Sequence, residues 1–371
     1  MPTQLLPAAA RAAKICLACA AVTLLAACSS SSLSGLPQAP TPGPPAAREA
    51  VATPDTPART TQDAAPEDTA RPTAAAANTP RPKQTDTPER GDTASDPTPT
   101  LAPTGEESAV LVGAGDIASC DSDQDEKTAK LLDGIAGTVF TLGDNAYDEG
   151  SSSEYKECYE PTWGRHKART RPAPGNHDYR TSDAKSYFSY FGEVVGKQGE
   201  GYYSYDLGAW HIVVLNSNCK SIGGCGEDSK QVRWLKDDLA ANPAHCTLAY
   251  WHHPRFTSGK HDNNQEISPL WQALYGAGAE IVMSGHDHNY QRYTPQDPAG
   301  KADPARGIRQ FVVGTGGKSL YDIEKPNANR EAASDKAYGV LKLTLNASSY
   351  QWEFIATERG RFTDSGSGTC H

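Results

Sequence analysis

The 7 Phe, 6 Trp and 16 Tyr residues of this 371-residue chain all lie at or after Phe140, so its first third contains no aromatic side chain. Because aromatic side chains contribute the largest buried areas of a protein core, we expect residues 1–106 to build no core of their own. The sequence therefore predicts a leader followed by one globular domain, residues 107–371.

The charge of the predicted domain argues against two classes of protein. It contains 27 basic and 35 acidic residues, a net charge of −8, and no basic stripe. We therefore expect no nucleic-acid-binding patch. No apolar run reaches the roughly 18 residues of a membrane-spanning helix, which argues against an integral membrane protein.

Residues 1–28 have the pattern of an export signal. Arg11 and Lys14 precede an apolar stretch, residues 15–27, that is too short to span a bilayer. The stretch ends in the sequence LAAC, which resembles the lipobox of bacterial lipoproteins and predicts lipidation at Cys28. An ordinary cleavage site with an incidental cysteine is the alternative. The expected product is exported and anchored by lipid at the bacterial cell membrane, with its catalytic domain outside the cytoplasm.

Residues 29–106 have the composition of a linker. They are rich in Pro, Thr, Ala and Ser and contain no aromatic residue, Ile, Met or Cys. Such a segment cannot bury enough apolar surface to offset its chain entropy, so we expect it to be disordered and extended. A stalk that lifts the domain from the membrane and a linker without a role predict the same behaviour.

Six cysteines follow the linker. In an exported protein they favour three disulfides, for which 15 connectivities exist. We expect Cys219–Cys225, which closes a Gly-rich loop, together with Cys246–Cys370 and Cys120–Cys158. A zinc knuckle is the alternative, but the sequence contains no C-x-x-C pair.

The domain sequence predicts an α/β fold. Short apolar runs that end abruptly in polar residues are typical of buried strands. They are residues 109–112, 138–142, 211–215, 246–251 and 280–283. Helices are expected at residues 124–132, 230–240 and 267–275, with Ser229 as an N-cap. Residues 339–345 and 350–355 alternate like strands with one solvated face. We expect two mixed β-sheets packed face to face with helices outside.

The ends of the expected strands carry side chains that bind metals. Open α/β sheets place ligands beyond the carboxyl ends of their strands. Five such ends offer six oxygen or nitrogen donors suited to Zn, Fe or Mn. These donors are Asp116, Asp144, Asn176, His252, His286 and His288. A single Asp at a strand end is usually a helix cap. Five strand ends that all carry metal-binding side chains predict a metal site.

The motifs around these donors are GD at Asp116, GDNAY at Asp144, GNHD at Asn176, HHP at His252 and GHDH at His286. In order and spacing they resemble the calcineurin-like metallophosphoesterases over nearly the whole domain. The tyrosine of GDNAY, Tyr147, makes the chain similar to the purple acid phosphatases. The resemblance implies a four-layer αββα sandwich.

The resemblance also implies a dinuclear metal centre. Asp116, Asp144, Tyr147 and His288 would hold the first metal, commonly Fe(III). Asp144 would bridge to a second metal, commonly Fe(II), Zn or Mn, held also by Asn176, His252 and His286. Ala118 stands where the wider superfamily often has a histidine, which fits ligation by Tyr147. Without that ligand, a Mn or Zn pair is expected.

The family further implies hydrolysis of small phosphomonoesters by a metal-bound hydroxide. His177, with Asp178 beside it, would bind phosphate and protonate the leaving oxygen. Substrate-binding candidates are His253, His261, Asn289 and Arg292, of which the last two could instead support the metal ligands from outside. The alternatives are a phosphodiesterase or nucleotidase and, more distantly, a cell-surface binding protein with a vestigial metal site. The oligomeric state is not indicated.

One motif invites a different interpretation. The sequence GTGGKS at residues 314–319 matches the tail of a Walker A loop, but the opening Gly would fall at Val312. A tight turn after a strand is the better interpretation.

Overall fold

The computed structural model describes residues 108–371. The predicted signal peptide, its lipidation site Cys28 and the linker 29–106 lie outside the described residues and stay predictions. Within residues 108–371, no helix combines the length and the apolar character needed to cross a bilayer.

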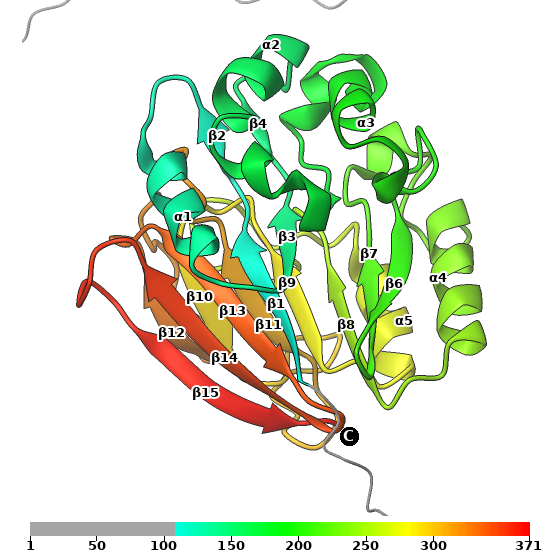
Figure 1. Cartoon of the computed structure of the whole chain (residues 1–371). Coiled ribbons are helices and arrows are strands. Elements are labelled where there is room, and N and C mark those ends of the chain that lie inside the picture. The colour runs from blue at the N-terminus through cyan, green and yellow to red at the C-terminus, as the bar shows by residue number, and fades with distance from the viewer. Residues whose placement is uncertain (1–107) are drawn as a thin grey trace, which may run out of the picture. The chain divides into compact units, whose positions relative to one another are not determined.

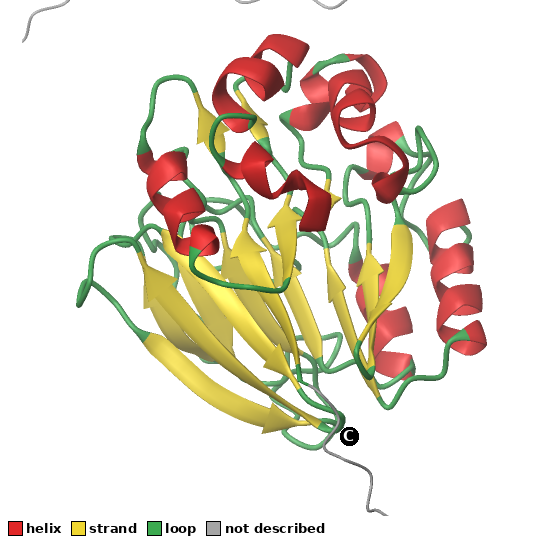
Figure 2. Cartoon of the chain, viewed as in Figure 1, coloured by secondary structure: helices red, strands yellow, loops and turns green. Residues whose placement is uncertain are grey.

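Two large mixed sheets form the centre of the domain (Figures 1 and 2). The first sheet has the strand order β15-β14-β13-β1-β3-β5. Its strands are β1 Ala109–Ala114, β3 Thr138–Leu142, β5 Thr170–Ala173, β13 Gly339–Leu345, β14 Ser349–Ala356 and β15 Asp364–Thr369. Strands β1, β3 and β5 are parallel, and β13 pairs antiparallel with β1.

The second sheet has seven strands in the order β12-β10-β11-β9-β8-β7-β6. They are β6 Tyr203–Leu207, β7 Trp210–Val214, β8 Cys246–Tyr250, β9 Ile281–Ser284, β10 Tyr290–Tyr293, β11 Arg309–Val313 and β12 Arg330–Ser334. Strands β7, β8, β9 and β11 are parallel, so their carboxyl ends meet at one edge. A two-stranded ribbon is formed by β2 Ala118–Ser119 and β4 Ala146–Tyr147. It lies beyond the carboxyl ends of β1 and β3 in the first sheet.

Side chains that alternate between the two faces of a strand contribute to two separate hydrophobic cores. On β7, Ile212 and Val214 belong to the large core that includes residues of both sheets, while Val213 belongs to a second core under the helices. Helices α4 Lys230–Ala241 and α5 Ser268–Gly276 cover that second core, and α1 Gln124–Asp133 packs on the first sheet. The predicted face-to-face sheets with flanking helices are confirmed.

The three expected helices are present within two residues of their predicted bounds, and the Ser229 side chain caps α4 by accepting a hydrogen bond from Val232 N. The helices between β4 and β6 were not predicted. They include α2 Ser152–Glu154, α3 Lys185–Phe191 and a π-helical turn between them. These segments have only 3, 5 and 7 residues, too few for a helical period to be recognised in the sequence.

Strand β15 was also missed because its sequence, DSGSGT, contains no apolar residue. Its glycines make room for rings of β14. A Cβ atom at Gly366 would lie 2.3 Å from the Trp352 ring, and one at Gly368 would lie 2.4 Å from the Tyr350 ring. The aromatic residues of the neighbouring strand β14 therefore specify where β15 pairs. The sequence of β15 alone does not reveal this.

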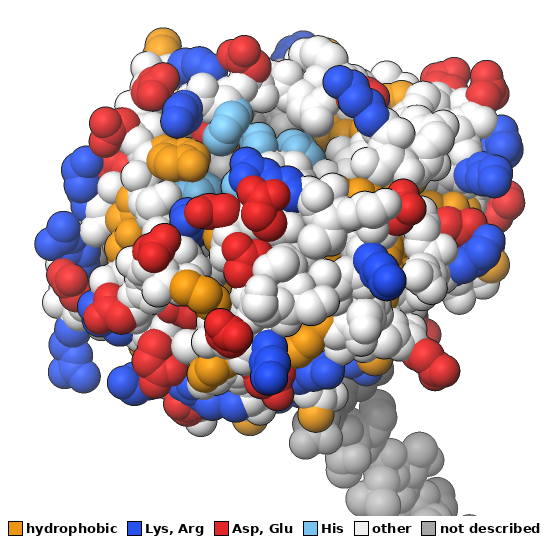
Figure 3. All heavy atoms as spheres, turned by 90° about the horizontal axis from the view of Figure 1, so that it is seen from above, with side chains coloured by type: hydrophobic (Ala, Val, Ile, Leu, Met, Phe, Trp, Pro, Cys, Tyr) orange, Lys and Arg blue, Asp and Glu red, His pale blue; other side chains and the backbone are white. Residues whose placement is uncertain are grey.

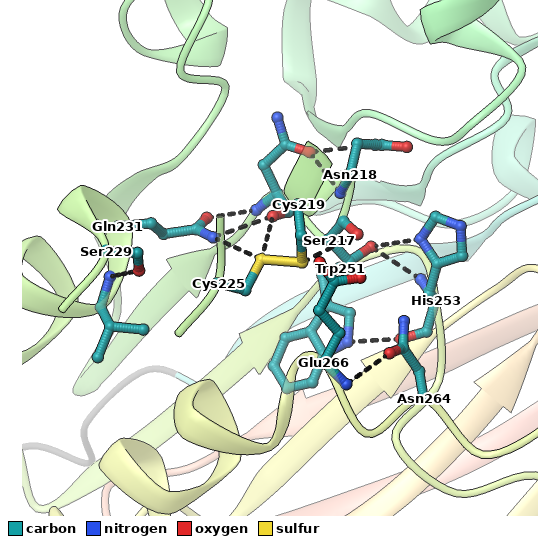
Figure 4. Close-up of a disulfide and its surroundings, with 12 residues drawn as sticks. Ser217, Asn218, Cys219, Cys225, Ser229, Gln231, Trp251, His253, Asn264 and Glu266 are labelled. Atoms are coloured by element: carbon teal, nitrogen blue, oxygen red, sulfur yellow. Dashed lines mark hydrogen bonds between the residues drawn. A yellow bond between two sulfur atoms is a disulfide. The ribbon is translucent and has the colours of Figure 1, made fainter. Parts of the chain in front are cut away.

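The structure contains the three disulfides that the sequence favoured, Cys120–Cys158, Cys219–Cys225 and Cys246–Cys370. Cys246–Cys370 joins β8 to the end of the chain. Cys219–Cys225 closes a loop directly after β7 (Figure 4). The zinc-knuckle alternative is therefore wrong for these six residues.

A buried histidine makes the stability of the second sheet depend on pH. His211 of β7 lies 2.9 Å from Asp206 of β6 through Nδ1 and 2.9 Å from Asp238 of α4 through Nε2. The hydrogen bond to Asp238, with that to Asp206, raises the pKa of His211 above its ordinary value of 6.5 in spite of burial. A raised folded-state pKa stabilises the fold below the unfolded pKa, and this stabilisation is lost as the pH rises through the folded pKa.

We therefore expect His211→Gln to lower the free energy of unfolding by on the order of 1–2 kcal/mol at about pH 5.5, and by less at about pH 9. Urea unfolding of both proteins at the two pH values measures the difference. A loss that does not change with pH would show that His211 is not charged in the folded protein.

Candidate metal centre

The strand ends of both sheets place three of the predicted ligands in an unusual backbone conformation. Asp116 follows β1 and Asp144 follows β3, with φ angles of 61° and 50°, and His286 follows β9 with a φ of 69°. This left-handed region is costly for residues with a side chain, by about 1–3 kcal/mol each. Each residue follows a glycine, and each turn directs its side chain to the same edge. Such repeated strain is typical of a functional site.

The three turns bring the side chains into one cluster. The Tyr147 hydroxyl lies 2.9 Å from Asp116 Oδ1, 2.8 Å from Asp144 Oδ2 and 3.1 Å from His288 Nε2. His252 Nε2 lies 3.3 Å from Asp144 Oδ2.

The remaining two predicted ligands adjoin His252. Its Nε2 lies 2.9 Å from Asn176 Oδ1 and 3.1 Å from His286 Nδ1. The structure therefore brings all seven predicted ligands together, although metal binding by each of them stays a prediction.

The donor set fits metal cations. Donor atoms of Asp116, Asp144 and His252, all fully or nearly fully buried, lie within 4.8 Å of one another. Among the described residues, neither carboxylate forms an ion pair with a lysine or arginine; their ion-pair partners are histidines. Burial, with the charges of both carboxylates, raises the pKa of Tyr147 well above its ordinary value. A cation among these oxygens would compensate the buried negative charge and favour the phenolate.

Outer hydrogen bonds orient the donors. His252 Nδ1 lies 2.7 Å from the Leu142 carbonyl, and His288 Nδ1 lies 2.8 Å from Ser319 Oγ. Each bond leaves Nε2 facing the cluster, which is the usual arrangement of metal-binding histidines. Backbone amides hold the carboxylates: His286 N donates to Asp116 Oδ2, and His177 N donates to Asp144 Oδ1.

The predicted pair of His177 and Asp178 is not a pair in the structure. The His177 ring packs against the Tyr147 ring, with centroids 4.3 Å apart, and its Nε2 lies 3.9 Å from Asp144 Oδ2. The fully buried Asp178 instead accepts hydrogen bonds from Gly175 N, the Asn145 side chain and the Tyr155 hydroxyl. A 3-10 turn begins at Asp178 and directs its carboxylate beneath the loop. We therefore correct its role from phosphate contact to support of the loop.

Two of the four predicted substrate-binding residues border the cluster. The ring centroids of His261 and His253 lie 4.0 Å and 4.4 Å from that of His286. His261 Nδ1 lies 2.9 Å from Asp287 Oδ1. Figure 3 shows several histidine side chains gathered in a hollow of this face, with charged side chains around them. Both residues are therefore placed where a substrate bound at the cluster would lie.

Ser217 holds the ring and the backbone of His253 in place (Figure 4). The backbone N–H of His253 donates to Ser217 Oγ, so the serine hydroxyl is free to donate to His253 Nδ1, 2.8 Å away. Burial, with the charge of His252, lowers the pKa of His253 to about 3. This lowered pKa favours a neutral His253 ring.

Asn289 and Arg292 are both held by contacts within the protein, so the structure gives no support to substrate binding by them. Asn289 is fully buried and donates to the Tyr321 carbonyl. Arg292 pairs with Asp364 of β15 and Glu331 of β12. Strand β10 carries its residues away from the site, so Arg292 joins strands instead of binding substrate.

Three residues of the site were missed, all from the loop after β11. Lys318 Nζ lies 5.2 Å from the centre of the Tyr147 ring, Ser319 bonds His288, and the Tyr321 ring stacks on His288 at 4.0 Å. This is the GTGGKS segment, and no helix follows it, so it is not a Walker A loop. A Cβ atom at Gly314 would lie 2.2 Å from the Asp287 carbonyl oxygen, which explains that glycine. The position of the loop at the carboxyl end of a parallel strand was the available signal.

The fold and the donor set together are those of metallophosphoesterases. Residues 109–290 match the family of calcineurin-like phosphoesterases, and residues 307–365 match the iron/zinc purple acid phosphatase-like protein C family. The chain therefore contains a calcineurin-like metallophosphoesterase domain, followed by a C-terminal segment of the purple acid phosphatase type.

Its curated relatives include plant enzymes. Purple acid phosphatase 21 of Arabidopsis thaliana is 28% identical over 259 residues, which cover 62% of this chain and 56% of the relative. Purple acid phosphatase 22 of the same plant is 32% identical over 153 residues, covering 39% and 34%. The chain thus spans about half or less of the length of the curated relatives it matches.

Solved structures support the fold. Purple acid phosphatase PPD1 from yellow lupin (Lupinus luteus) seeds aligns with a TM-score of 0.58 and 17% identity, covering 71% of this chain and 54% of that chain. GAP50, the anchor in the inner membrane complex of Plasmodium, aligns with a TM-score of 0.56 and 14% identity, covering 71% and 89%. At these identities the likeness concerns the fold alone.

Proposed function

We propose that this chain is a dinuclear-metal phosphatase that hydrolyses phosphomonoesters. The observation that carries the proposal is the convergence of seven oxygen and nitrogen donors in one cluster, in which Asp144 contacts both the Tyr147 hydroxyl and His252. The plant relatives that carry the name purple acid phosphatase support the same class. A vestigial binding protein would be expected to have lost donors, and this chain has kept all seven.

The donors divide into two groups that share one carboxylate. Asp116, Tyr147 and His288 lie on one side of Asp144, and Asn176, His252 and His286 lie on the other. When bound, two metal ions would acidify a water molecule and neutralise the phosphoryl oxygens. Tyr147 favours Fe(III) at the first position, with Fe(II), Zn or Mn at the second.

The chain's own residues then bind the ester and supply a proton. The ring of His253, held at Nδ1 by Ser217, is the candidate contact for a phosphoryl oxygen, and His261 packs on the same ligand, His286. His177, at the opposite side of Asp144, is the candidate acid for the leaving oxygen. The edge where the strands of both sheets end thus provides residues that bind the phosphoryl group and a residue that protonates the leaving oxygen.

The test is hydrolysis of p-nitrophenyl phosphate beside its bis-ester by the full chain with oxidised cysteines. We expect turnover of the monoester after loading with Fe, Mn or Zn, and a loss of at least about 100-fold after chelation that reloading reverses. Preference for the bis-ester would show a phosphodiesterase. No turnover with two metals bound per chain would contradict the enzyme and favour a binding role.

We further propose that the protein is exported and anchored through Cys28. The apolar stretch 15–27 and its LAAC end support this location, as do three disulfides in one domain. The same phosphatase assay, run on membrane and soluble fractions, tests the anchor. Activity that stays in the membrane fraction when Cys28→Ser replaces the native chain would exclude lipidation there.

A further inference from the structure

A row of polar contacts leads from the loop after β11 to the ring of His177. Lys318 Nζ lies 2.7 Å from Asp148 Oδ1 and 3.1 Å from Ser119 Oγ. The backbone carbonyl of Asp148 lies 2.5 Å from His177 Nδ1. Asp148 therefore connects a cation on one loop with the candidate acid on another.

The contact with Asp148 determines which nitrogen of His177 carries a proton. A backbone carbonyl only accepts hydrogen bonds, so His177 Nδ1 must be protonated and donate. The other nitrogen, Nε2, faces Asp144 Oδ2 at 3.9 Å. A ring held in this way keeps Nε2 on the side of the predicted metal ligands.

Lys318 is itself held in place at both ends. Its backbone N–H donates to the Asp116 carbonyl at 3.0 Å, so the lysine begins directly beside a predicted metal ligand. Its side chain is 21% exposed, whereas that of Asp148 is 54% exposed. The more buried partner thus anchors the more exposed carboxylate.

We propose that Lys318 is a positioning residue for His177: by binding the Asp148 carboxylate, it fixes the carbonyl that orients the imidazole. The inference rests on the proposed phosphatase function. In the hydrolysis, a water oxygen forms the new P–O bond and the ester P–O bond breaks. The leaving oxygen takes the electron pair and a proton from His177 Nε2, and the proton of the attacking water replaces it.

A second contact of Lys318 offers a competing explanation. Its ammonium lies 5.2 Å from the centre of the Tyr147 ring, a distance typical of a cation–π interaction. A role through Tyr147 would change metal binding and would affect all substrates equally. A role through His177 depends on how much the leaving group needs a proton.

The experiment compares Lys318→Met and Lys318→Arg with the native full chain on two monoesters. Glycerol 2-phosphate has a leaving group that requires protonation, whereas 2,4-dinitrophenyl phosphate does not. We expect Lys318→Met to lower kcat about tenfold for the first and less than about twofold for the second, with unchanged metal content. Lys318→Arg, which keeps the charge, should recover most of the loss. Lys336→Met, at an exposed lysine paired with Asp322, is the matched control.

Two further measurements decide the outcome. In a His177→Asn background, Lys318→Met should cause no additional loss, because it acts through the imidazole. An equal loss on both esters, or an additive loss in the double variant, would overturn the proposal.

Side-chain ¹⁵N NMR of the zinc-loaded protein tests the positioning without any turnover. We expect His177 to be protonated at Nδ1 in the native chain and in Lys318→Arg, and to be a mixture of tautomers in Lys318→Met. An unchanged tautomer in Lys318→Met would overturn the positioning role. Absence of phosphatase activity in a native chain that shows the expected tautomers would instead count against the proposed function.

Discussion

Asp144→Asn is expected to lower kcat/KM for p-nitrophenyl phosphate by about 1000-fold or more and to leave fewer than two metal ions bound per chain. Asp144 is the carboxylate shared by both groups of donors: its Oδ2 lies 2.8 Å from the Tyr147 hydroxyl and 3.3 Å from His252 Nε2. The amide has the same shape but replaces one oxygen and removes the negative charge. Metal content and kcat/KM measured on the same preparations test the expectation.

The control for this variant is Asp322→Asn, the same change at an exposed carboxylate outside the cluster. It should leave both quantities unchanged. The folded state of Asp144→Asn, checked by its urea midpoint, should also persist, because the amide oxygen can still accept from His177 N. Two metals per chain and activity within tenfold of the native value would show that the cluster around Tyr147 is not the metal centre.

The parts of the site that the sequence predicted share one property: they are defined locally. All predicted metal ligands except Tyr147, which lies in β4, follow closely on the end of a strand, as Asp116 follows β1 and His252 follows β8. Parallel strands bring such ends together by topology alone, so a list of strand ends predicts a cluster without any knowledge of side-chain contacts. The same reasoning predicted the two sheets, because short apolar runs indicate buried strands.

The residues that sequence reasoning misplaced or missed depend on contacts between distant segments. Asp178 adjoins His177 in the chain, yet the turn directs its carboxylate towards Tyr155 and the loop backbone. Arg292 pairs with Asp364, 72 residues away. Lys318 reaches the site from the end of β11, 170 residues from Asp148. Proximity in sequence predicts neither the direction of a side chain nor a long-range ion pair, and these three residues needed the structure.

Gly175→Ala is expected to lower the free energy of unfolding by about 3 kcal/mol and kcat/KM by about 100-fold. A Cβ atom at this position would lie 2.1 Å from the Asp144 backbone nitrogen and 2.2 Å from Asp144 Oδ1. Both sides of this contact are held by hydrogen bonds, because Asp144 Oδ1 accepts from His177 N and Gly175 N donates to the buried Asp178. The methyl group must therefore separate the two loops that carry Asp144 and Asn176.

Gly226→Ala, at a position with no atom within 4 Å of the added carbon, is the matched control and should change neither quantity. Gly175→Ala could instead match this control in urea unfolding and in turnover. The loops would then separate without cost, and the close contact of the two strand ends would not determine the geometry of the site.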